Sequence, residues 1–479
     1  MNNCYNCNNN WNISTLDQGD QLIEIELKIV IIFAKSSHKV AIHASYVMHT
    51  EVHRSTGIAA MHICLASSKK IIIIDKVQNN SLALTDGRPA SSVEYDLNTG
   101  SKRLLPLKTN TFCSAGSYLG DGTLLSTGGA ENKKSYDEGF TSLRTITPCD
   151  DGSCQWKEDP KGMSTNRWYP TATSLSDGSV FILGGSNRSI AVNEATFNNP
   201  TYEFFPKPKK NPGPRHLQFL VDTLPFNLYP MVHLMPGPNG QTHLFIMANQ
   251  DSIIFDWSTG NVVKKLPKIP GGPRNYPLTG TSVMLPLRPD NNYKPQVLVC
   301  GGNSKNDPKN EALNSCGRID LSLDKPQWEM DNFGGFGRVM PDAVLLADGT
   351  VLFLNGASTG VAGYNKDDKH LKADNPVLTA VLYDDTKPVG KRFKTLDSST
   401  IPRLYHSVAL LLPTAKVFVT GSSPQDSILT KGVKFPTEFR VEEFSPPYLS
   451  SNQPRGNIIS VANSTDINHK PTKVKYNSA

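Results

Sequence analysis

The distribution of apolar and polar positions repeats seven times along the chain. Each copy is a short apolar run that follows a turn and ends in glycine or another small residue. In the clearest copies an Asp-Gly pair precedes the run: LGDGTLLSTGG (Leu119–Gly129), LSDGSVFILGG (Leu175–Gly185) and LLADGTVLFLNG (Leu345–Gly356). Looser copies lie near His62, His233, Leu285 and Leu411. Successive copies are roughly 50 to 65 residues apart, a spacing that is typical of propeller blades.

Each copy predicts a β-hairpin, because Asp-Gly between apolar alternations supplies a tight turn and the closing glycines permit close backbone packing. A single hairpin cannot bury both of its faces, so the repeats must stack against one another. The predicted fold is therefore all-β, a seven-bladed kelch-like β-propeller over residues 55–435. Functional side chains are expected where loops from several blades meet at the axis.

Composition agrees with a loop-rich β-protein that forms mainly one large domain. The chain has 479 residues with 36 Gly, 34 Pro and a formal net charge of +6. The Lys and Arg residues are dispersed and accompany no aromatic-basic module, so no nucleic-acid partner is expected. The apolar segment Ile29–Ala34 is too short to span a bilayer, so no membrane partner is expected from it either.

The cysteines favour an oxidising compartment. Cys149 and Cys154 flank a polar turn, and Cys300 and Cys316 bracket a polar loop that follows a strand. Both pairs are predicted to form local disulfides, with four free buried thiols as the alternative.

The two ends do not follow the repeat. Residues 1–54 are an atypical, Asn-rich start without the basic stretch, apolar core and cleavage site of a secretory leader. Near residue 436, TEFRVEEFSPPYLS (Thr437–Ser450) predicts the start of a further β-module that would continue to residue 479. About thirty polar residues after it are too few for a second core, so residues 436–479 are expected to be the truncated start of a β-sandwich domain.

Three stretches carry side chains that a β-repeat does not need. Cys113, Tyr169 and the adjacent Tyr405 and His406 each precede a blade hairpin at a similar offset. Equivalent offsets project to equivalent radial positions in a propeller, so these side chains can converge near the axis. Taken singly, each is more often an ordinary packing residue, and only the combination indicates a site.

The chain resembles the plant and fungal glyoxal oxidases, which are relatives of galactose oxidase among the copper-radical oxidases. The resemblance spans roughly residues 57–449. The motifs that carry it are SVEYD (Ser92–Asp96), the CSAG stretch at Cys113, TPCDDGSCQW (Thr147–Trp156), RWYPT (Arg167–Thr171), YEFFP (Tyr202–Pro206), GFGRVMPDAVLLADGTVLFLNGA (Gly335–Ala357), RLYHS (Arg403–Ser407) and TEFRVEEFSPPYL. No tryptophan comes directly after the strand that ends in Gly184-Gly185, where the galactose branch places a ring over the modified tyrosine, and this favours the glyoxal branch.

The resemblance implies a copper site and a protein-derived cofactor. Cys113 would form a thioether with Tyr169, and the modified ring would hold a radical. Tyr169, Tyr405 and His406 would bind copper, and Tyr405 would act as the base that takes the substrate proton. The implied reaction oxidises an aldehyde to a carboxylic acid and reduces dioxygen to hydrogen peroxide.

The resemblance also implies a second copper-binding histidine from the domain that follows the propeller, and no matching motif precedes Ala479. The activity of this chain therefore stays open at this point, with two alternatives to the oxidase. One is a non-catalytic kelch-type propeller that binds carbohydrate or protein partners, and the other is a fragment without an independent fold.

The expected setting follows from the family and the cysteine pattern. We expect a secreted monomer in the apoplast or cell wall, with a small aldehyde and O2 as its substrates and cell-wall carbohydrate as a further partner.

Overall fold

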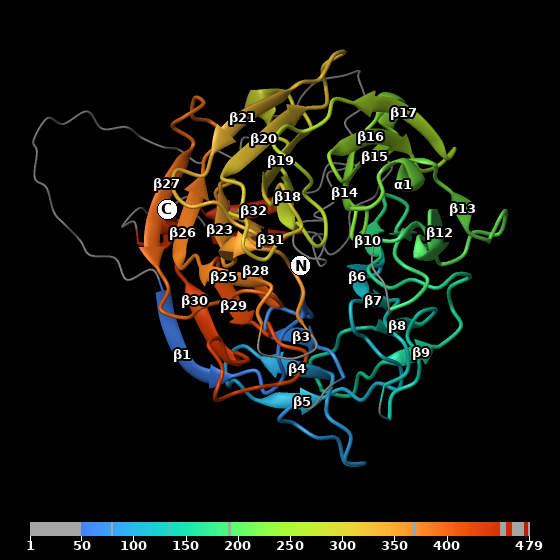
Figure 1. Cartoon of the computed structure of the whole chain (residues 1–479), viewed down its shortest axis with the longest axis vertical. Coiled ribbons are helices and arrows are strands. Elements are labelled where there is room, and N and C mark those ends of the chain that lie inside the picture. The colour runs from blue at the N-terminus through green and yellow to red at the C-terminus, as the bar shows by residue number, and fades with distance from the viewer. Residues whose placement is uncertain are drawn as a thin grey trace, which may run out of the picture.

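The computed structural model describes residues 49–77, 80–133, 135–189, 193–365, 370–450, 457–461 and 474–477. In these residues seven four-stranded antiparallel sheets follow one another around a central axis (Figure 1). The first strands of neighbouring blades contact one another from the second blade along the chain through to the seventh, and from the seventh to the first. The predicted seven-bladed β-propeller is confirmed.

In each blade the four strands pair side by side, and the first strand lies nearest the axis (Figure 1). The first three blades contain β2 (His62–Leu65), β3 (Lys70–Ile74), β4 (Ser92–Asp96) and β5 (Lys102–Leu104); β6 (Ala115–Tyr118), β7 (Leu124–Thr127), β8 (Leu143–Ile146) and β9 (Lys157–Asp159); and β10 (Thr171–Ser174), β11 (Val180–Leu183), β12 (Thr201–Phe205) and β13 (Arg215–His216). The next two contain β14 (Met231–Pro236), β15 (Thr242–Ala248), β16 (Asp251–Asp256) and β17 (Asn261–Leu266); and β18 (Gly280–Met284), β19 (Gln296–Gly301), β20 (Ser315–Asp320) and β21 (Trp328–Asn332).

The sixth blade contains β22 (Asp342–Leu345), β23 (Val351–Leu354), β26 (Thr379–Tyr383) and β27 (Phe393–Ser398). Two hairpins stand outside the blades: β24 (Ala357–Gly360) with β25 (Ala373–Pro376), and β31 (Asn457–Val461) with β32 (Val474–Asn477). The short helical segments are α1 (Phe219–Asp222), η1 (Ala195–Phe197), η2 (Pro238–Gly240), η3 (Pro289–Asn291) and η4 (Pro447–Leu449). None of the helices in the described ranges has the length and apolar character needed to cross a membrane.

The seventh blade is built from both ends of the propeller. It contains β28 (Ser407–Leu411), β29 (Val417–Gly421), β30 (Arg440–Phe444) and β1 (His49–Ser55), with β1 antiparallel to β30. The expected propeller bounds, 55 and 435, therefore fall inside this blade, because its third and fourth strands come from just beyond them. Residues 1–48 lie outside the described residues, and a separate domain over 436–479 stays a prediction.

The seven expected hairpins are the first two strands of the seven blades. In the copy at β6–β7, Gly122 adopts a φ of 83°, and the backbone amide of Thr123 donates to Asp121 Oδ1 over 2.9 Å. Glycine takes this left-handed conformation at little cost, and the aspartate side chain satisfies the turn backbone. The Asp-Gly signal thus has a direct structural cause.

The hydrophobic core lies between blades, so each inner strand is buried on both faces. In β3, Ile71 and Ile73 pack toward the seventh blade, while Ile72 and Ile74 pack toward the second. Burial on both faces explains why this strand is a continuous apolar run instead of an alternation.

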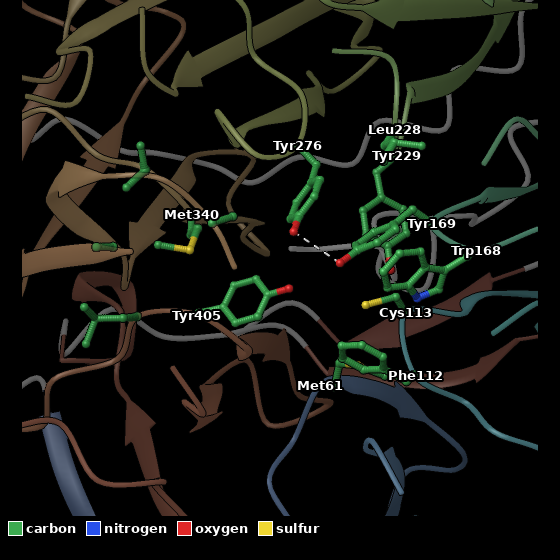
Figure 2. Close-up of a cluster of buried hydrophobic side chains, with 14 of the residues drawn as sticks. Met61, Phe112, Cys113, Trp168, Tyr169, Leu228, Tyr229, Tyr276, Met340 and Tyr405 are labelled. Carbon is green, nitrogen blue, oxygen red and sulfur yellow. Dashed lines mark hydrogen bonds between the residues drawn. The ribbon is translucent and has the colours of Figure 1, made fainter. Parts of the chain in front are cut away.

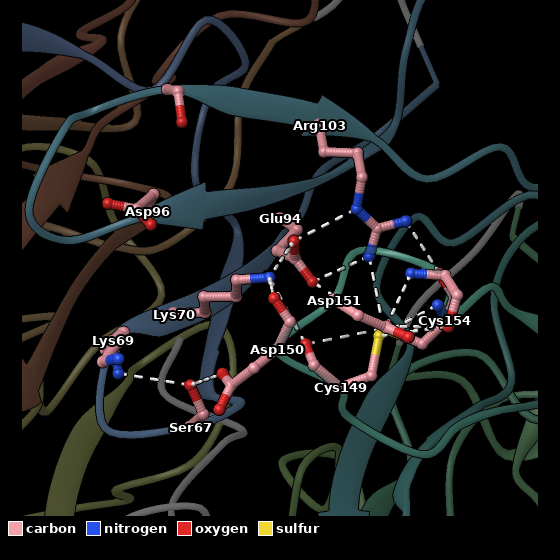
Figure 3. A network of polar contacts seen from close by, with 12 residues as sticks. Ser67, Lys69, Lys70, Glu94, Asp96, Arg103, Cys149, Asp150, Asp151 and Cys154 are labelled. Carbon is pink, nitrogen blue, oxygen red and sulfur yellow. Dashed lines mark hydrogen bonds and ion pairs between the residues drawn. A yellow bond between two sulfur atoms is a disulfide. The ribbon is translucent and has the colours of Figure 1, made fainter.

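Both predicted disulfides are present, between Cys149 and Cys154 and between Cys300 and Cys316. The Cys149–Cys154 loop of the second blade docks on the first, where Arg103 Nη1 donates to Cys154 O over 2.7 Å and Lys70 Nζ donates to Asp150 O over 3.0 Å (Figure 3). This disulfide loop therefore joins neighbouring blades.

Candidate functional site

The same backbone position precedes the first strand in five blades, and a non-glycine residue occupies it with positive φ. These residues are Cys113 (55°), Tyr169 (61°), Tyr229 (51°), Met340 (57°) and His406 (62°). Such φ values are uncommon without glycine and persist only where surrounding contacts hold them. Five blades thus present one side chain each from the same place in the ring.

The structure brings the four sequence-predicted residues together in the centre of the propeller. Cys113, Tyr169 and Tyr405 belong to one buried cluster, and His406 stacks on Tyr405. The Cys113 sulfur lies beside Tyr169, and the Tyr405 hydroxyl is directed toward Tyr169 from the other side of the cluster (Figure 2). The backbone amide of Tyr169 donates to Cys113 O over 3.0 Å, which links their two blades directly.

Three aromatic rings enclose Tyr169. Tyr276 stacks on it with ring centroids 4.5 Å apart and an interplanar angle of 26°, while Trp168 lies at 4.4 Å and Tyr229 meets it edge-on at 5.0 Å. The hydroxyl oxygens of Tyr169 and Tyr276 are 3.2 Å apart, the separation of a hydrogen bond (Figure 2). The phenol is thus held in an aromatic cage, with the Tyr276 hydroxyl at hydrogen-bond distance.

Tyr405 and His406 carry polar atoms without partners. Their rings stack at 3.9 Å, and both side chains are 1% exposed. In the described part of the chain, the Tyr405 hydroxyl and both imidazole nitrogens of His406 have no hydrogen-bond partner. Buried polar atoms are nearly always paired, so three such atoms in one place indicate a site built for a ligand.

Burial keeps these groups neutral. It raises the pKa of Tyr169 and of Tyr405 well above 10, and it raises the pKa of the Cys113 thiol to about 12. It also lowers the pKa of His406 well below 6.5, so this imidazole is in the form that can donate a lone pair to a metal.

The donor set fits a divalent transition-metal ion. Such an ion would ionise the two phenols, and its two charges would cancel those of the phenolates, which suits a buried site. Imidazole nitrogen and phenolate oxygen are ligands that Cu(II) accepts. Within the described ranges no group of three or more His, Cys, Asp or Glu side chains could hold a metal ion.

A fixed positive charge lies close to the site. Lys76 is fully buried, and its Nζ donates to Gln425 O over 2.9 Å and to Asp426 O over 2.7 Å. The ammonium lies 5.3 Å from the ring centroid of Tyr364, a neighbour of the site, and it helps to lower the pKa of His406. The lysine charge therefore acts with burial to favour the neutral imidazole.

Tyr276 and Tyr229 were missed in the sequence. A signal was present for Tyr229, because it precedes a proline directly before the first strand of its blade, as Tyr169 does. Tyr276 also precedes a proline, but it lies further from the first strand of its blade and lacks the positive φ of Tyr169 and Tyr229, so the Tyr-Pro pair does not place it.

The glyoxal oxidase N-terminus family model matches residues 58–448. The chain is 37% identical over 448 residues to "Aldehyde oxidase GLOX" of Vitis pseudoreticulata, covering 88% of this chain and 78% of that protein. It is 35% identical over 465 residues to "Aldehyde oxidase GLOX1" of Arabidopsis thaliana, covering 88% of this chain and 68% of that protein.

A solved structure shares the fold. It is a fungal alcohol oxidase of the AA5 family in complex with copper, with a TM-score of 0.61 and 19% sequence identity, covering 86% of this chain and 80% of that one.

Proposed function

This chain belongs to the glyoxal oxidase family of oxidase enzymes, and we propose that it is a copper-radical oxidase that converts small aldehydes to carboxylic acids. One observation carries the proposal: Cys113, Tyr169, Tyr405 and His406 meet in one buried site where the last two have unpartnered polar atoms. A propeller that only binds partners has no need of such a set.

Tyr169, Tyr405 and His406 would hold the copper through two phenolate oxygens and one imidazole nitrogen. When bound, copper would take one of the two electrons of each aldehyde oxidation and would lower the pKa of the coordinated phenols. The stacking of Tyr405 on His406 at 3.9 Å keeps both ligands in one orientation. The surrounding aromatic rings exclude water and so protect an oxidised ring from reduction.

Cys113 and Tyr169 would supply the organic half of the cofactor. In the crosslinking step an S–C bond replaces the thiol S–H bond of Cys113 and a ring C–H bond of Tyr169 next to its hydroxyl. The two protons and two electrons released pass to dioxygen, which becomes hydrogen peroxide. The contact between the side chains supports this step, since the thiol lies beside the ring (Figure 2).

In each turnover, the hydrated aldehyde would lose two electrons and two protons to become the acid, and dioxygen would gain both to become hydrogen peroxide. Tyr405 would receive one of these protons, because its hydroxyl oxygen has no competing hydrogen bond in the described structure. Tyr276 would hold Tyr169 by stacking and by its hydroxyl contact at 3.2 Å.

We also propose that the protein works outside the cell, in the apoplast or cell wall, as a monomer that contacts wall carbohydrate. The two disulfides support an oxidising compartment.

The test uses the 479-residue chain, purified without metal and then given Cu(II) and air. Peptide mass spectrometry should find Cys113 joined to Tyr169 with the loss of two hydrogen atoms. Hydrogen peroxide should then form in equal amount to the acid produced from a small aldehyde such as methylglyoxal.

A matched pair of variants controls the assignment. Cys113→Ser should abolish both the crosslinked peptide and the oxidase activity. Cys64→Ser, at an equally buried cysteine in a different cluster, should retain both. Absence of the crosslink in the copper-treated wild-type chain would contradict the proposal.

A further inference from the structure

Four blades carry a fully buried arginine just before their first strand. They are Arg167, Arg274, Arg338 and Arg403. Each donates from Nη1 to a backbone carbonyl at the end of the second strand of its own blade: Gly184, Gly301, Asn355 and Gly421 respectively. Each arginine therefore links the loop before the first strand of its blade to the end of the second strand.

Two of these four arginines pair with a buried carboxylate. Arg167 Nε donates to Glu203 Oε1 over 2.9 Å, and Arg403 Nε donates to Glu442 Oε2 over 2.8 Å, with all four side chains at most 4% exposed. By contrast, Nε of Arg274 and Nε of Arg338 have no hydrogen-bond partner among the described residues.

The two paired carboxylates lie in the blades that supply candidate metal ligands. Arg167 precedes Tyr169 by two residues, and Arg403 precedes Tyr405 by two. The blade of Cys113 has its own arginine, Arg144, with Nε 3.8 Å from a Glu158 carboxylate oxygen. The blades of Tyr276 and Met340 supply no candidate ligand, and their arginines are the two whose Nε has no hydrogen-bond partner in the described part of the chain.

The paired arginines also fix the backbone of the preceding blade. The carbonyl of Arg167 accepts from the Gly129 amide at 3.1 Å, and that of Arg403 accepts from the Gly356 amide at 2.8 Å. Arg338 has the same type of link, from the Gly302 amide at 2.8 Å. Arg338 thus shares every feature of the set except the carboxylate.

A charge-paired arginine has a stricter geometry than an unpaired one, because the planar guanidinium accepts a carboxylate only within a narrow range of positions. Two residues further on, Tyr169 must meet the Cys113 thiol closely enough for an S–C bond to form. Met340, at the equivalent position after Arg338, packs in the cluster and has no proposed role in crosslinking or metal binding. The arginine that is paired with a carboxylate therefore lies two residues before the tyrosine whose crosslinking depends most on distance.

We propose that the Arg167–Glu203 and Arg403–Glu442 ion pairs are positioning devices that hold Tyr169 and Tyr405 in register for crosslinking and metal binding. This inference rests on the proposed function, because it assigns these pairs to the same site. Neither arginine touches the reacting atoms, so their effect is exerted through the backbone that they fix.

The first test compares Arg167→Lys and Glu203→Gln with Arg338→Lys as the matched control. Copper-free protein is mixed with Cu(II) and air, and the crosslinked Cys113–Tyr169 peptide is followed over time. The two test variants should form it at least about tenfold more slowly than wild type, since a loss of alignment acts directly on the rate of a proximity-dependent step. Arg338→Lys should remain within about twofold of wild type, because its loop has no reacting side chain to position.

The second test applies to the other pair. Arg403→Lys and Glu442→Gln should weaken Cu(II) binding at least about tenfold in a competition titration with a chromophoric chelator, again with Arg338→Lys as control. A thermal unfolding curve of each variant accompanies both measurements. If Arg167→Lys or Arg403→Lys does not fold, the corresponding glutamine variant carries the test, because it keeps the size of the side chain.

The outcomes separate the two levels of the proposal. A wild-type chain that never crosslinks and binds no copper overturns the proposed function and leaves the ion pairs nothing to position. A wild-type chain that crosslinks, with all variants slowed equally or none slowed, overturns the positioning role alone. The positioning role is supported if Arg167→Lys and Glu203→Gln slow crosslinking and Arg338→Lys does not, although all three variants lower the melting temperature by the same amount.

Discussion

Tyr276→Phe removes a single oxygen atom from the candidate site and leaves the stacked ring in place. The hydroxyl that is lost lies 3.2 Å from the Tyr169 hydroxyl. Burial raises the pKa of Tyr276 to about 12, so this group keeps its proton at neutral pH. If the proposed copper ionises Tyr169, Tyr276 would act only as the donor of that hydrogen bond.

The size of the effect follows from the charge on the acceptor. A hydrogen bond to a charged group contributes about 1.5 to 3 kcal/mol. Because about 1.4 kcal/mol corresponds to a factor of ten, its loss should raise the pKa of the copper-bound Tyr169 phenol by about one to two units. The metal-free protein should lose only about 1 kcal/mol of unfolding free energy, since both hydroxyls are then neutral.

The assay is a pH titration of the phenolate-to-copper absorption band in the copper-loaded protein. Tyr229→Phe is the matched control, because Tyr229 also packs on Tyr169 but donates its hydroxyl to Ser114 O at 3.2 Å instead. Its midpoint should equal that of wild type, while the Tyr276→Phe midpoint should lie about one unit or more higher. Equal midpoints in the two variants would refute the assigned hydrogen bond.

Three further predictions concern the scaffold. Burial raises the pKa of Asp75 from its ordinary 3.8 to about 7 in the folded chain, so the folded state holds a proton that the unfolded state has already released. The folded state is therefore destabilised as the pH rises through about 7. Asp75→Asn should show a smaller fall in melting temperature between pH 5 and pH 8 than wild type. Gly129→Ala should prevent stable folding in expression and unfolding assays, because its Cβ would lie 1.9 Å from Asn110 O, whereas Gly122→Ala, with open space around it, should cost about 1 kcal/mol. Replacing Cys300 and Cys316 with alanine should lower the unfolding free energy in urea by about 3 kcal/mol, the chain-entropy value for a loop closed over a separation of 16 residues, and an unchanged urea midpoint would contradict this.

The fold was predictable because its signals are local. An Asp-Gly turn such as Asp121-Gly122 requires glycine at one position and a capping carboxylate beside it, and both are legible in the sequence. Each disulfide joins cysteines that are 5 or 16 residues apart, so their pairing was also local. Closure of the ring could not be predicted in this way, because β1 and β30 pair across almost the whole chain and neither carries a turn signal.

The site was predictable only in part. Cys113, Tyr169, Tyr405 and His406 were found through a combined motif, since none of them is unusual alone. Tyr276 was missed because its stacking on Tyr169 depends on how one blade is rotated against another, which no local pattern reports. The buried carboxylates that pair with arginine were missed for the same reason, since each lies on a third strand far from the loop that it supports.

The ring geometry gives a physical reason why chemistry and fold are separable in this protein. The turn glycines, the buried arginines and the apolar strands repeat from blade to blade and would build the same ring around many different central residues. The position with positive φ holds a cysteine, two tyrosines, a methionine and a histidine in five blades, so its backbone tolerates any of them. The chemistry at the centre of the propeller is therefore determined by which side chains occupy these equivalent positions. The arginines that are paired with a carboxylate lie in the blades where a displacement of the central side chain would most affect the proposed crosslinking and metal binding.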